Sequence, residues 1–418
     1  MVEVGDKVEI RKNGKVYTGI VMPHHAFSDK NVVVIKLENG YNIGIDLRGC
    51  ELKVIEKRTG RVKRKFGKIP SNKKKPYIAL LGTGGTIASY VDYETGAVYP
   101  ASTPEELAFA VPEIFELCNV ETKILFQKLS EDIIPKDWQR MARETAKYLN
   151  SGKPVIIAHG TDTMSYSATA LAFMLKNLNF PVVFVGSQRS SDRPSSDAFI
   201  NLISAVRVAL TDIGEVVVTM HSNISSDGCF IHRATKVRKM HSSRRDAFIS
   251  INAKPIGKVE NGTLEFYTEY KKVSGEKVKV MSKLDENVAL IYYYPGFKKE
   301  DFEKITEDKN GIVIAGTGLG HIKANFIKII KKLVKDGIPV VMTTQCIEGR
   351  VNMNVYSNGR KLLKAGVISG EDMLPETALI KLMWVLANEE NVEEAMKKNI
   401  AGEISERREI GAKNLYEM

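Results

Sequence analysis

The chain has 418 residues, 43% of them hydrophobic and 27% charged, and its formal net charge at pH 7 is +11. This composition is typical of a soluble globular protein with two or three domains. No uncharged apolar run approaches the roughly 18 residues needed to span a bilayer, and MVEVGDKVEI at the N-terminus lacks the apolar core of a signal peptide. We therefore expect a cytoplasmic protein with no membrane association.

The cysteines Cys50, Cys118, Cys229 and Cys346 are scattered along the chain without Cys-x-x-Cys spacing. Such spacing supports neither a zinc site nor a disulfide framework. We expect each cysteine to be a small structural hydrophobe, and we expect no metal site.

Residues 1–55 alternate apolar and polar positions around two turn signals, Asn13-Gly14 and Asn39-Gly40. Period-2 alternation with Asn-Gly turns predicts β-hairpins, and several short strands in so few residues predict a small β-barrel domain. Small barrels often bind RNA or protein, and they also often serve only as spacers. Nothing in this segment identifies a ligand.

The segment 56–76 contains most of the net positive charge. Residues 57–75 include ten lysines and arginines and no acidic residue. Its glycines, its proline and its lack of apolar periodicity predict a linker or an exposed loop. It is either a phosphate-binding patch for nucleic acid, with a steep dependence on salt, or a solvated hinge.

From residue 77 onward, strands and helices alternate, which predicts a doubly wound α/β domain over 77–275 with helices on both faces of a parallel sheet. The expected strands are Tyr77 to Leu81, Pro154 to Ala158, Pro181 to Val185 and Glu215 to Thr219. The expected helices are Pro104 to Ala110, Lys136 to Leu149, Ser165 to Asn177 and Asp197 to Leu210.

A second α/β domain is expected over 285–418, after a charged linking stretch at 270–285. Its predicted strands are Val288 to Tyr293, Gly311 to Ala315 and Pro339 to Met342. An amphipathic helix is expected over Ala324 to Asp336 with Gly337 as its stop, and Pro375 to Asn388 begins the terminal helices.

Two loops suggest a nucleophile site for amide hydrolysis. LLGTGGTIAS at 80–89 and IIAHGTDTM at 156–164 each end an apolar strand in a glycine-framed loop that carries threonine hydroxyls. Ligands of α/β sheets bind outside the carboxyl ends of the strands, and glycine lets the backbone approach a substrate closely. Two threonine loops are thus expected to face one amide, with oxyanion donors supplied by backbone N–H groups.

A threonine hydroxyl needs a base before it can attack an amide. A lysine side chain can serve as this base when burial and neighbouring charges lower its pKa. The stretch RATKVRKMHSSRRDAF at 233–248 offers Lys236 and Lys239. The residues alone leave open which of the two points inward.

TGGTIAS, HGTDTM and VRKMHSSRRDAF resemble, in order, three motifs of the L-asparaginase family of amidohydrolases. The resemblance covers roughly residues 77–418. It implies two α/β domains, a dimer and a Thr-Lys-Asp relay in which Thr86, Thr161, Asp162 and Lys239 are catalytic. The number of residues between the lysine and the pair Ala247-Phe248 favours Lys239 over Lys236.

The same resemblance implies a set of substrate-binding residues. Ser130 matches the serine that binds the α-carboxylate of the substrate. Asp162 matches the residue that contacts the substrate's α-amino group, and Tyr99 matches the lid tyrosine. Glu131 occupies a position that differs among relatives. Gly85 and Gly160 complete the expected set.

An asparaginase-like core with an N-terminal small barrel and a basic linker resembles the D subunit family, GatD, of archaeal glutamyl-tRNA(Gln) amidotransferases. The resemblance implies a glutaminase that supplies ammonia to a GatE-type partner, which converts Glu-tRNA(Gln) to Gln-tRNA(Gln). A homodimer of this chain would lie within a heterotetramer. The resemblance also implies that ATP and Mg²⁺ bind to the partner and that this chain holds no cofactor, which agrees with the lack of a phosphate-cradling loop signature here.

Two other interpretations remain open. One is a free-standing L-asparaginase or glutaminase with an accessory N-terminal domain, and the other is a tRNA-binding scaffold with a vestigial site. Thr86 is the favoured nucleophile, although Thr161 is also possible. Preference for glutamine over asparagine does not follow from these residues.

Overall fold

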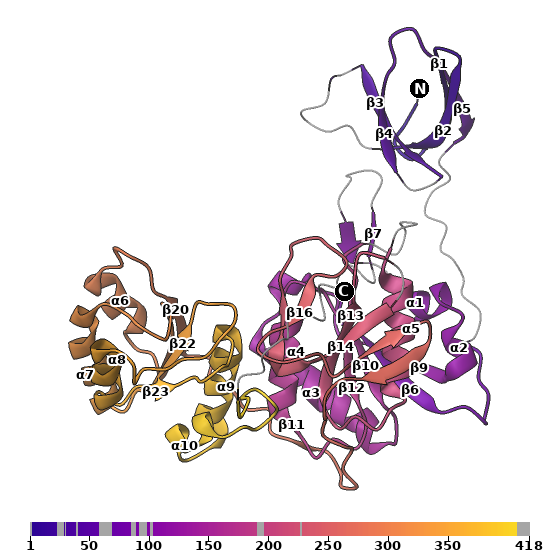
Figure 1. Cartoon of the computed structure of the whole chain (residues 1–418). Coiled ribbons are helices and arrows are strands. Elements are labelled where there is room, and N and C mark those ends of the chain that lie inside the picture. The colour runs from indigo at the N-terminus through magenta and orange to yellow at the C-terminus, as the bar shows by residue number, and fades with distance from the viewer. Residues whose placement is uncertain are drawn as a thin grey trace.

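The computed structural model describes the chain except for residues 1, 23–28, 30, 39–40, 58–68, 85–88, 92–97, 101–102, 190–195, 226–227 and 408–418. For residues 89–91, 98–100 and 110 it describes the backbone only. The predicted turn at Asn39-Gly40 and most of the predicted basic linker thus lie outside the described residues. Figure 1 shows a small N-terminal sheet and two α/β domains.

The N-terminal segment folds into a five-stranded antiparallel sheet in the order β4-β3-β2-β1-β5. The sheet curls around a small apolar core that includes Val8, Ile10 and Ile35 (Figure 1). Asn13 and Gly14 both have positive φ, as a two-residue hairpin turn requires. The strands are β1 (Lys7–Lys12), β2 (Lys15–Val21), β3 (Val32–Leu37), β4 (Asn42–Asp46) and β5 (Glu51–Glu56). The structure confirms the predicted antiparallel β domain.

An eight-stranded sheet in the order β18-β17-β14-β13-β12-β10-β6-β9 forms the centre of the first α/β domain. The strands from β9 to β13 in this order are parallel, and the remaining three are antiparallel. The strands are β6 (Tyr77–Gly82), β9 (Asn119–Ile124), β10 (Val155–Ala158), β12 (Val182–Val185), β13 (Val216–His221), β14 (Gly228–Arg233), β17 (Gly257–Glu260) and β18 (Thr263–Phe266). The four predicted parallel strands are confirmed, whereas the antiparallel edge was not predicted.

Both faces of this sheet are buried, because successive residues of β6 enter different cores. Ala79 and Leu81 pack with helices α3 and α4, whereas Ile78 and Leu80 pack with α1, α2 and α5. This arrangement explains the continuous apolar runs of the central strands. The helices are α1 (Pro104–Ala110), α2 (Ile114–Leu117), α3 (Pro135–Asn150), α4 (Met164–Met174) and α5 (Ala198–Ala209).

Helix α4 ends three residues before the predicted end at Asn177. Leu175 and Lys176 instead form β11 (Leu175–Lys176), which pairs with β19 (Lys279–Val280) from the charged stretch between the domains. The prediction was wrong here because a contact distant in sequence replaced the last helical turn. The same contact packs the interdomain stretch against the first domain.

The second α/β domain has a parallel sheet in the order β20-β21-β22-β23. The predicted helix over 324–336 begins as a 3-10 turn and ends before Gly337, whose φ is +87°. The elements are β20 (Val288–Tyr292), α6 (Lys299–Thr306), β21 (Gly311–Gly316), η4 (Ala324–Phe326), α7 (Ile327–Lys335), β22 (Val340–Thr344), α8 (Ser357–Lys364), β23 (Ile368–Ser369), α9 (Pro375–Asn388) and α10 (Val392–Lys397).

Helix α9 joins the two α/β domains, because it packs on α4 of the first and on β20 and β21 of the second (Figure 1). The rings of Phe173 and Trp384 are stacked across the α4–α9 contact with centroids 6.2 Å apart. Nearby, the Lys236 ammonium and the Asp372 carboxylate form a buried ion pair of 2.7 Å between the domains. The domain junction thus combines apolar packing with one buried charge pair.

Replacing Asp372 by Asn should leave the Lys236 ammonium buried without a counter-charge. We expect Asp372→Asn to lower the free energy of unfolding by about 3–5 kcal/mol, as measured by chemical denaturation. Glu393→Gln is the control, because Glu393 pairs with Lys397 on the exposed surface of α10 and should cost less than about 1 kcal/mol. Equal unfolding midpoints for the two variants would contradict a structural role for the buried pair.

Candidate active site

The two threonine loops follow neighbouring parallel strands. Gly82 at the end of β6 lies opposite Ala158 at the end of β10. The backbone N–H and the hydroxyl of Thr83 both donate to the carbonyl of Ala158, at 3.1 and 2.9 Å. The first threonine of TGGT therefore holds the loops together and is fully buried. Gly85 and Thr86 lie outside the described residues.

The predicted lid residue Tyr99 belongs to β8 (Val98–Pro100). Its backbone pairs with Tyr90 in β7 (Ser89–Val91), so the two form a small antiparallel ribbon. The position of the Tyr99 side chain lies outside the described part of the chain, and its role stays a prediction.

The loop after β10 is packed so tightly that a side chain at either of two glycine positions would force its neighbours to move. A Cβ on Gly160 would lie 2.7 Å from Cβ of Ser130, and a Cβ on Gly186 would lie 2.9 Å from Cγ2 of Thr161. Both distances are shorter than real Cβ contacts allow. Gly160 was predicted at the site, whereas Gly186, which follows β12, was not.

Thr161, Asp162 and Lys239 come together in the structure. The Lys239 ammonium lies 2.9 Å from the Thr161 hydroxyl oxygen and 2.7 Å from a carboxylate oxygen of Asp162. Thr161 is 5% exposed, whereas the Asp162 side chain is 65% exposed. The arrangement places one amine between a buried hydroxyl and a solvent-facing carboxylate.

The backbone of β15 (Val237–Lys239) decides which lysine reaches the threonine loop. Lys239 pairs with Phe248 of β16 (Phe248–Ser250), which gives a structural reason for the spacing to the Ala-Phe pair. Lys236 belongs to a 3-10 turn, η3 (Ala234–Lys236), and its ammonium points instead to Asp372. Burial lowers the pKa of Lys236, and the Asp372 carboxylate opposes this shift.

Ser130 lies beside the same loop, at the start of the 3-10 turn η2 (Ser130–Asp132). Its carbonyl accepts a 2.7 Å hydrogen bond from the Thr163 hydroxyl. Its own hydroxyl lies 3.4 Å from Asp162 Oδ2 and 3.5 Å from Glu131 Oε2. The residues expected at the α-carboxylate and the α-ammonium are thus neighbours, as they must be if both groups lie on one carbon atom.

The segment that carries Ser130 is fixed by residues that were not predicted at the site. The carboxylate of Asp137 accepts from the Lys128 ammonium at 2.6 Å and from the Ile134 N–H at 3.0 Å. Pro135 followed by Asp137 in the first turn of α3 is a helix-start signal that could have indicated this bond. Gly84 lies close against this segment, since a Cβ added at Gly84 would be 2.3 Å from the Lys128 carbonyl oxygen.

A buried polar network holds Gly186 against Thr161. The Asn201 side chain donates to the Gly186 carbonyl at 2.9 Å and to Asp197 Oδ2 at 3.0 Å. Asp197 in turn accepts from the N–H groups of Gln188 and Arg189. Asp197 is fully buried and each of its carboxylate oxygens has a donor, so it fixes residues 186–189 directly after β12.

His159 is fully buried at the end of β10. Its Nδ1 lies 2.6 Å from the Gly160 carbonyl oxygen, which only accepts, so this nitrogen carries the proton. Burial lowers the pKa of His159 to about 4, and the bond to Gly160 opposes the shift. The ring is therefore neutral near pH 7 and has a structural role.

Within the described residues, no group of three or more His, Cys, Asp and Glu side chains is arranged to hold a metal ion. None of the described helices is long and apolar enough to cross a membrane. All four cysteines are free thiols; Cys118 and Cys229 are buried, whereas Cys346 is exposed. The expectation of a buried thiol is therefore wrong for Cys346.

Three family profiles match this chain. Residues 77–272 match "Asparaginase, N-terminal", residues 287–398 match "Glutaminase/Asparaginase C-terminal domain" and residues 2–55 match "GatD N-terminal domain". The L-asparaginase of Thermococcus kodakarensis superposes with a TM-score of 0.73 at 32% identity, over 79% of this chain and 99% of its own. L-asparaginase I of Vibrio cholerae gives 0.70 at 30% identity over the same shares. The fold and the site define a protein of the asparaginase class.

Two relatives match nearly the whole chain. The glutamyl-tRNA(Gln) amidotransferase D subunit of Pyrococcus furiosus is 56% identical, over 97% of this chain and 95% of that protein. Its counterpart from T. kodakarensis is 51% identical, over 96% and 94%. The chain belongs to the family of glutamyl-tRNA(Gln) amidotransferase D subunits.

Adding a methyl group at residue 160 should displace Ser130. We expect Gly160→Ala to lower the free energy of unfolding by about 1–3 kcal/mol, measured by denaturation, because the core must move to accept the new atom. Gly275→Ala is the matched control, since nothing lies within 4 Å of its Cβ position and its φ is not positive. If both variants unfold at the same denaturant concentration, the close approach of Gly160 to Ser130 is not a packing constraint.

Proposed function

We propose that this chain is the glutaminase subunit of a tRNA-dependent amidotransferase. It hydrolyses glutamine to glutamate and ammonia, and a GatE-type partner uses the ammonia to convert Glu-tRNA(Gln) to Gln-tRNA(Gln). The observation that carries the hydrolytic part is the position of Lys239 between Thr161 and Asp162. Family membership over almost the entire chain, including the N-terminal sheet, supports the amidotransferase part.

The reaction proposed is a two-step acyl transfer. A threonine hydroxyl, which we assign to Thr86, attacks the side-chain amide carbon of glutamine and gives up its proton. The C–N bond then breaks, the nitrogen takes up a proton and leaves as ammonia, and an ester joins the glutamyl group to the enzyme. Water hydrolyses this ester to release glutamate and restore the hydroxyl.

Lys239 is the proton acceptor in this proposal. As the neutral amine, it accepts a proton from Thr161, whose hydroxyl oxygen is 2.9 Å away, and Asp162 stabilises the resulting ammonium at 2.7 Å. Thr161 then activates either the first hydroxyl or the water. Its burial favours the role, because a hydroxyl shielded from bulk water exchanges its proton with Lys239 rather than with solvent.

Substrate recognition is assigned to the exposed side of the same cluster. The Ser130 hydroxyl and Asp162 Oδ2, 3.4 Å apart, would bind the α-carboxylate and the α-ammonium of one amino acid. Glu131 lies at the edge of this pair. We further assign Tyr99 to the lid, and the N–H groups at Gly85 and Gly160 to the substrate oxygens.

Family membership supports a proposal for the rest of the assembly. We propose that the chain forms a homodimer within a heterotetramer with the GatE-type partner, and that ATP and Mg²⁺ bind to that partner. The ten basic residues in 57–75 suit a tRNA-bearing assembly. A free-standing L-asparaginase is the competing interpretation, and it rests on the structural similarity over 79% of the chain.

Removing the Thr161 hydroxyl should abolish most of the hydrolysis. We expect Thr161→Val, which keeps the shape of the side chain, and Lys239→Met each to lower kcat for ammonia release from glutamine by roughly 10²–10⁴-fold. The double variant should be little worse than either single one, because the groups act as a unit. Thr161→Ser should recover much of the rate, and the exposed Lys397→Met is the control. Near wild-type rates in Thr161→Val or Lys239→Met would refute the assignment.

The partner and the charged tRNA distinguish the two interpretations. We expect ammonia release from glutamine to increase strongly when the partner subunit, Glu-tRNA(Gln) and ATP are added to the purified chain, because release of ammonia is useful only when an acceptor is present. The measurement compares glutamine with asparagine, with and without these additions. Rapid hydrolysis of asparagine by the chain alone would instead establish a free asparaginase with an added N-terminal domain.

A further inference from the structure

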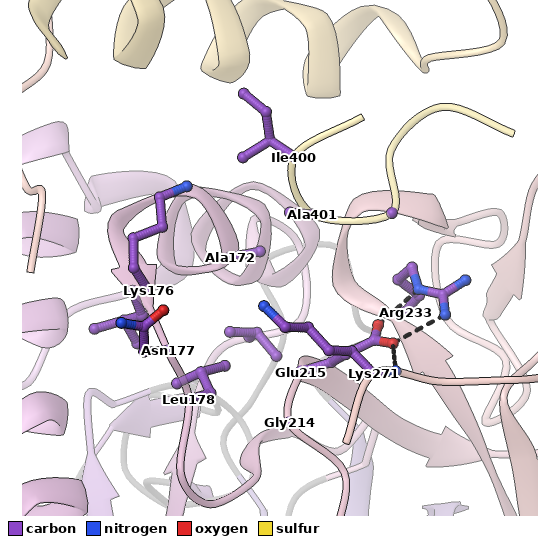
Figure 2. Close-up of a pocket in the computed structure, with 13 residues that line it drawn as sticks. Ala172, Lys176, Asn177, Leu178, Gly214, Glu215, Arg233, Lys271, Ile400 and Ala401 are labelled. Carbon is purple, nitrogen blue, oxygen red and sulfur yellow. Dashed lines mark hydrogen bonds and ion pairs between the residues drawn. The ribbon is translucent and has the colours of Figure 1, made fainter. Parts of the chain in front are cut away.

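A cavity of about 230 Å³ lies at the end of α4 that is farther from the threonine loop. It is bounded by β11, by the start of β13 and by residues 400–402 of the C-terminal segment (Figure 2). Helix α4 begins at Met164, two residues after Asp162, and its 11 residues span roughly 16 Å. The cavity is therefore separate from the candidate active site.

Its charged lining is predominantly basic. Lys176, Arg233 and Lys271 face one acidic residue, Glu215. Arg233 and Glu215 already satisfy each other through two hydrogen bonds of 2.6 and 3.0 Å. The backbone N–H of Lys271 donates to the same carboxylate at 2.7 Å. The Glu215 carboxylate is thus already paired and is not available to either lysine ammonium. Of the two lysines, Lys176 is half-buried and Lys271 is exposed.

Among the described residues, neither lysine has a counter-charge in contact. In this part of the chain, no carboxylate oxygen lies within 4.0 Å of the Lys176 or Lys271 ammonium. Figure 2 shows the two lysines on different sides of the cavity, with Arg233 turned toward Glu215. The Lys176 ammonium lies 4.3 Å from the centre of the Trp384 ring, a contact that does not neutralise its charge.

The surroundings of Lys176 disfavour its charge. Burial lowers the pKa of Lys176 to about 8, the more distant Glu403 and Glu389 oppose the shift, and Lys271 adds to it. Glu403 is itself paired with Lys381 at 2.6 Å. An anion between Lys176 and Lys271 would relieve both the desolvation and the repulsion between the two cations.

We propose that this cavity binds a small organic anion through Lys176 and Lys271. The ligand carries a carboxylate or phosphate group for the two ammonium groups and a short apolar part for the remaining wall. That wall is formed by Ala172, Leu175, Leu178, Val216, Ile400 and Ala401. The volume is below the roughly 300–1,000 Å³ of pockets for drug-sized ligands, so the ligand has only a few non-hydrogen atoms.

Binding would link the two domains, because the lining includes both α4 of the first domain and residues 400–402 near the C-terminal end of the second. A ligand that binds only the folded chain adds RT ln(1 + [L]/Kd) to the free energy of unfolding, so the unfolding temperature rises with the ligand concentration. The site is independent of the proposed glutaminase mechanism, since neither lysine touches the threonine loop in the described structure.

The test titrates the full chain with succinate and, separately, with inorganic phosphate, using calorimetry and thermal unfolding. We expect saturable binding of at least one anion in calorimetry, and an unfolding temperature that rises with the logarithm of the anion concentration once that concentration exceeds Kd. Lys176→Gln and Lys271→Gln should each weaken binding by roughly tenfold or more, as expected for loss of a charge-assisted hydrogen bond. Lys335→Gln on α7 removes the same charge outside the cavity and should leave binding unchanged.

Binding of succinate alone would identify a carboxylate ligand, and binding of phosphate alone a phosphorylated one. Ammonia release from glutamine by the two cavity variants serves as a check that they are folded. Absence of saturable binding for both anions would overturn the proposal. Equal affinity in the wild type and in a folded Lys176→Gln, Lys271→Gln double variant would overturn it as well.

Discussion

Between the two α/β domains, the Lys236 ammonium and the Asp372 carboxylate lie 2.7 Å apart and almost completely out of water. A buried charge is tolerated only with its partner, so this pair fixes the position of the segment 233–239 relative to the second domain. Arg233 at one end of the segment pairs with Glu215, and Lys239 at the other end reaches Thr161 and Asp162. The candidate relay therefore depends on a contact made outside it.

Close packing provides the second constraint on the site. Three glycines, Gly84, Gly160 and Gly186, lie where a Cβ would meet a neighbour at less than 3.0 Å. Each of these glycines packs the residues directly after one strand against another loop. Gly84, Gly160, Gly186 and the Ser130 turn thus belong to one packed unit. Hydroxyls and carboxylates at the candidate site are held by this unit rather than by their own rotamer preferences.

The N-terminal domain and the two α/β domains resemble different groups of proteins. The two α/β domains have the architecture of L-asparaginases, which match 79% of the chain, whereas the N-terminal sheet matches the GatD N-terminal profile. That sheet has a small apolar core of its own. Such a division is consistent with a hydrolytic core to which a separate module for the assembly has been added, because a function lies in sites added to a fold rather than in the fold.

Sequence patterns by themselves determined the α/β class, the small antiparallel domain and the parallel strands, because burial on one or both faces directly sets the apolar periodicity. Glycine and threonine spacing located the loop at Thr161 for the same local reason. The residues alone left Lys236 and Lys239 open and the family resemblance favoured Lys239, but the contact of Lys239 with Thr161 comes from the tertiary structure. Only the tertiary structure decided that α4 ends at Met174 and that Gly186 lies against Thr161. Each of these depends on contacts between segments far apart in the chain, and local sequence carries no signal for such contacts.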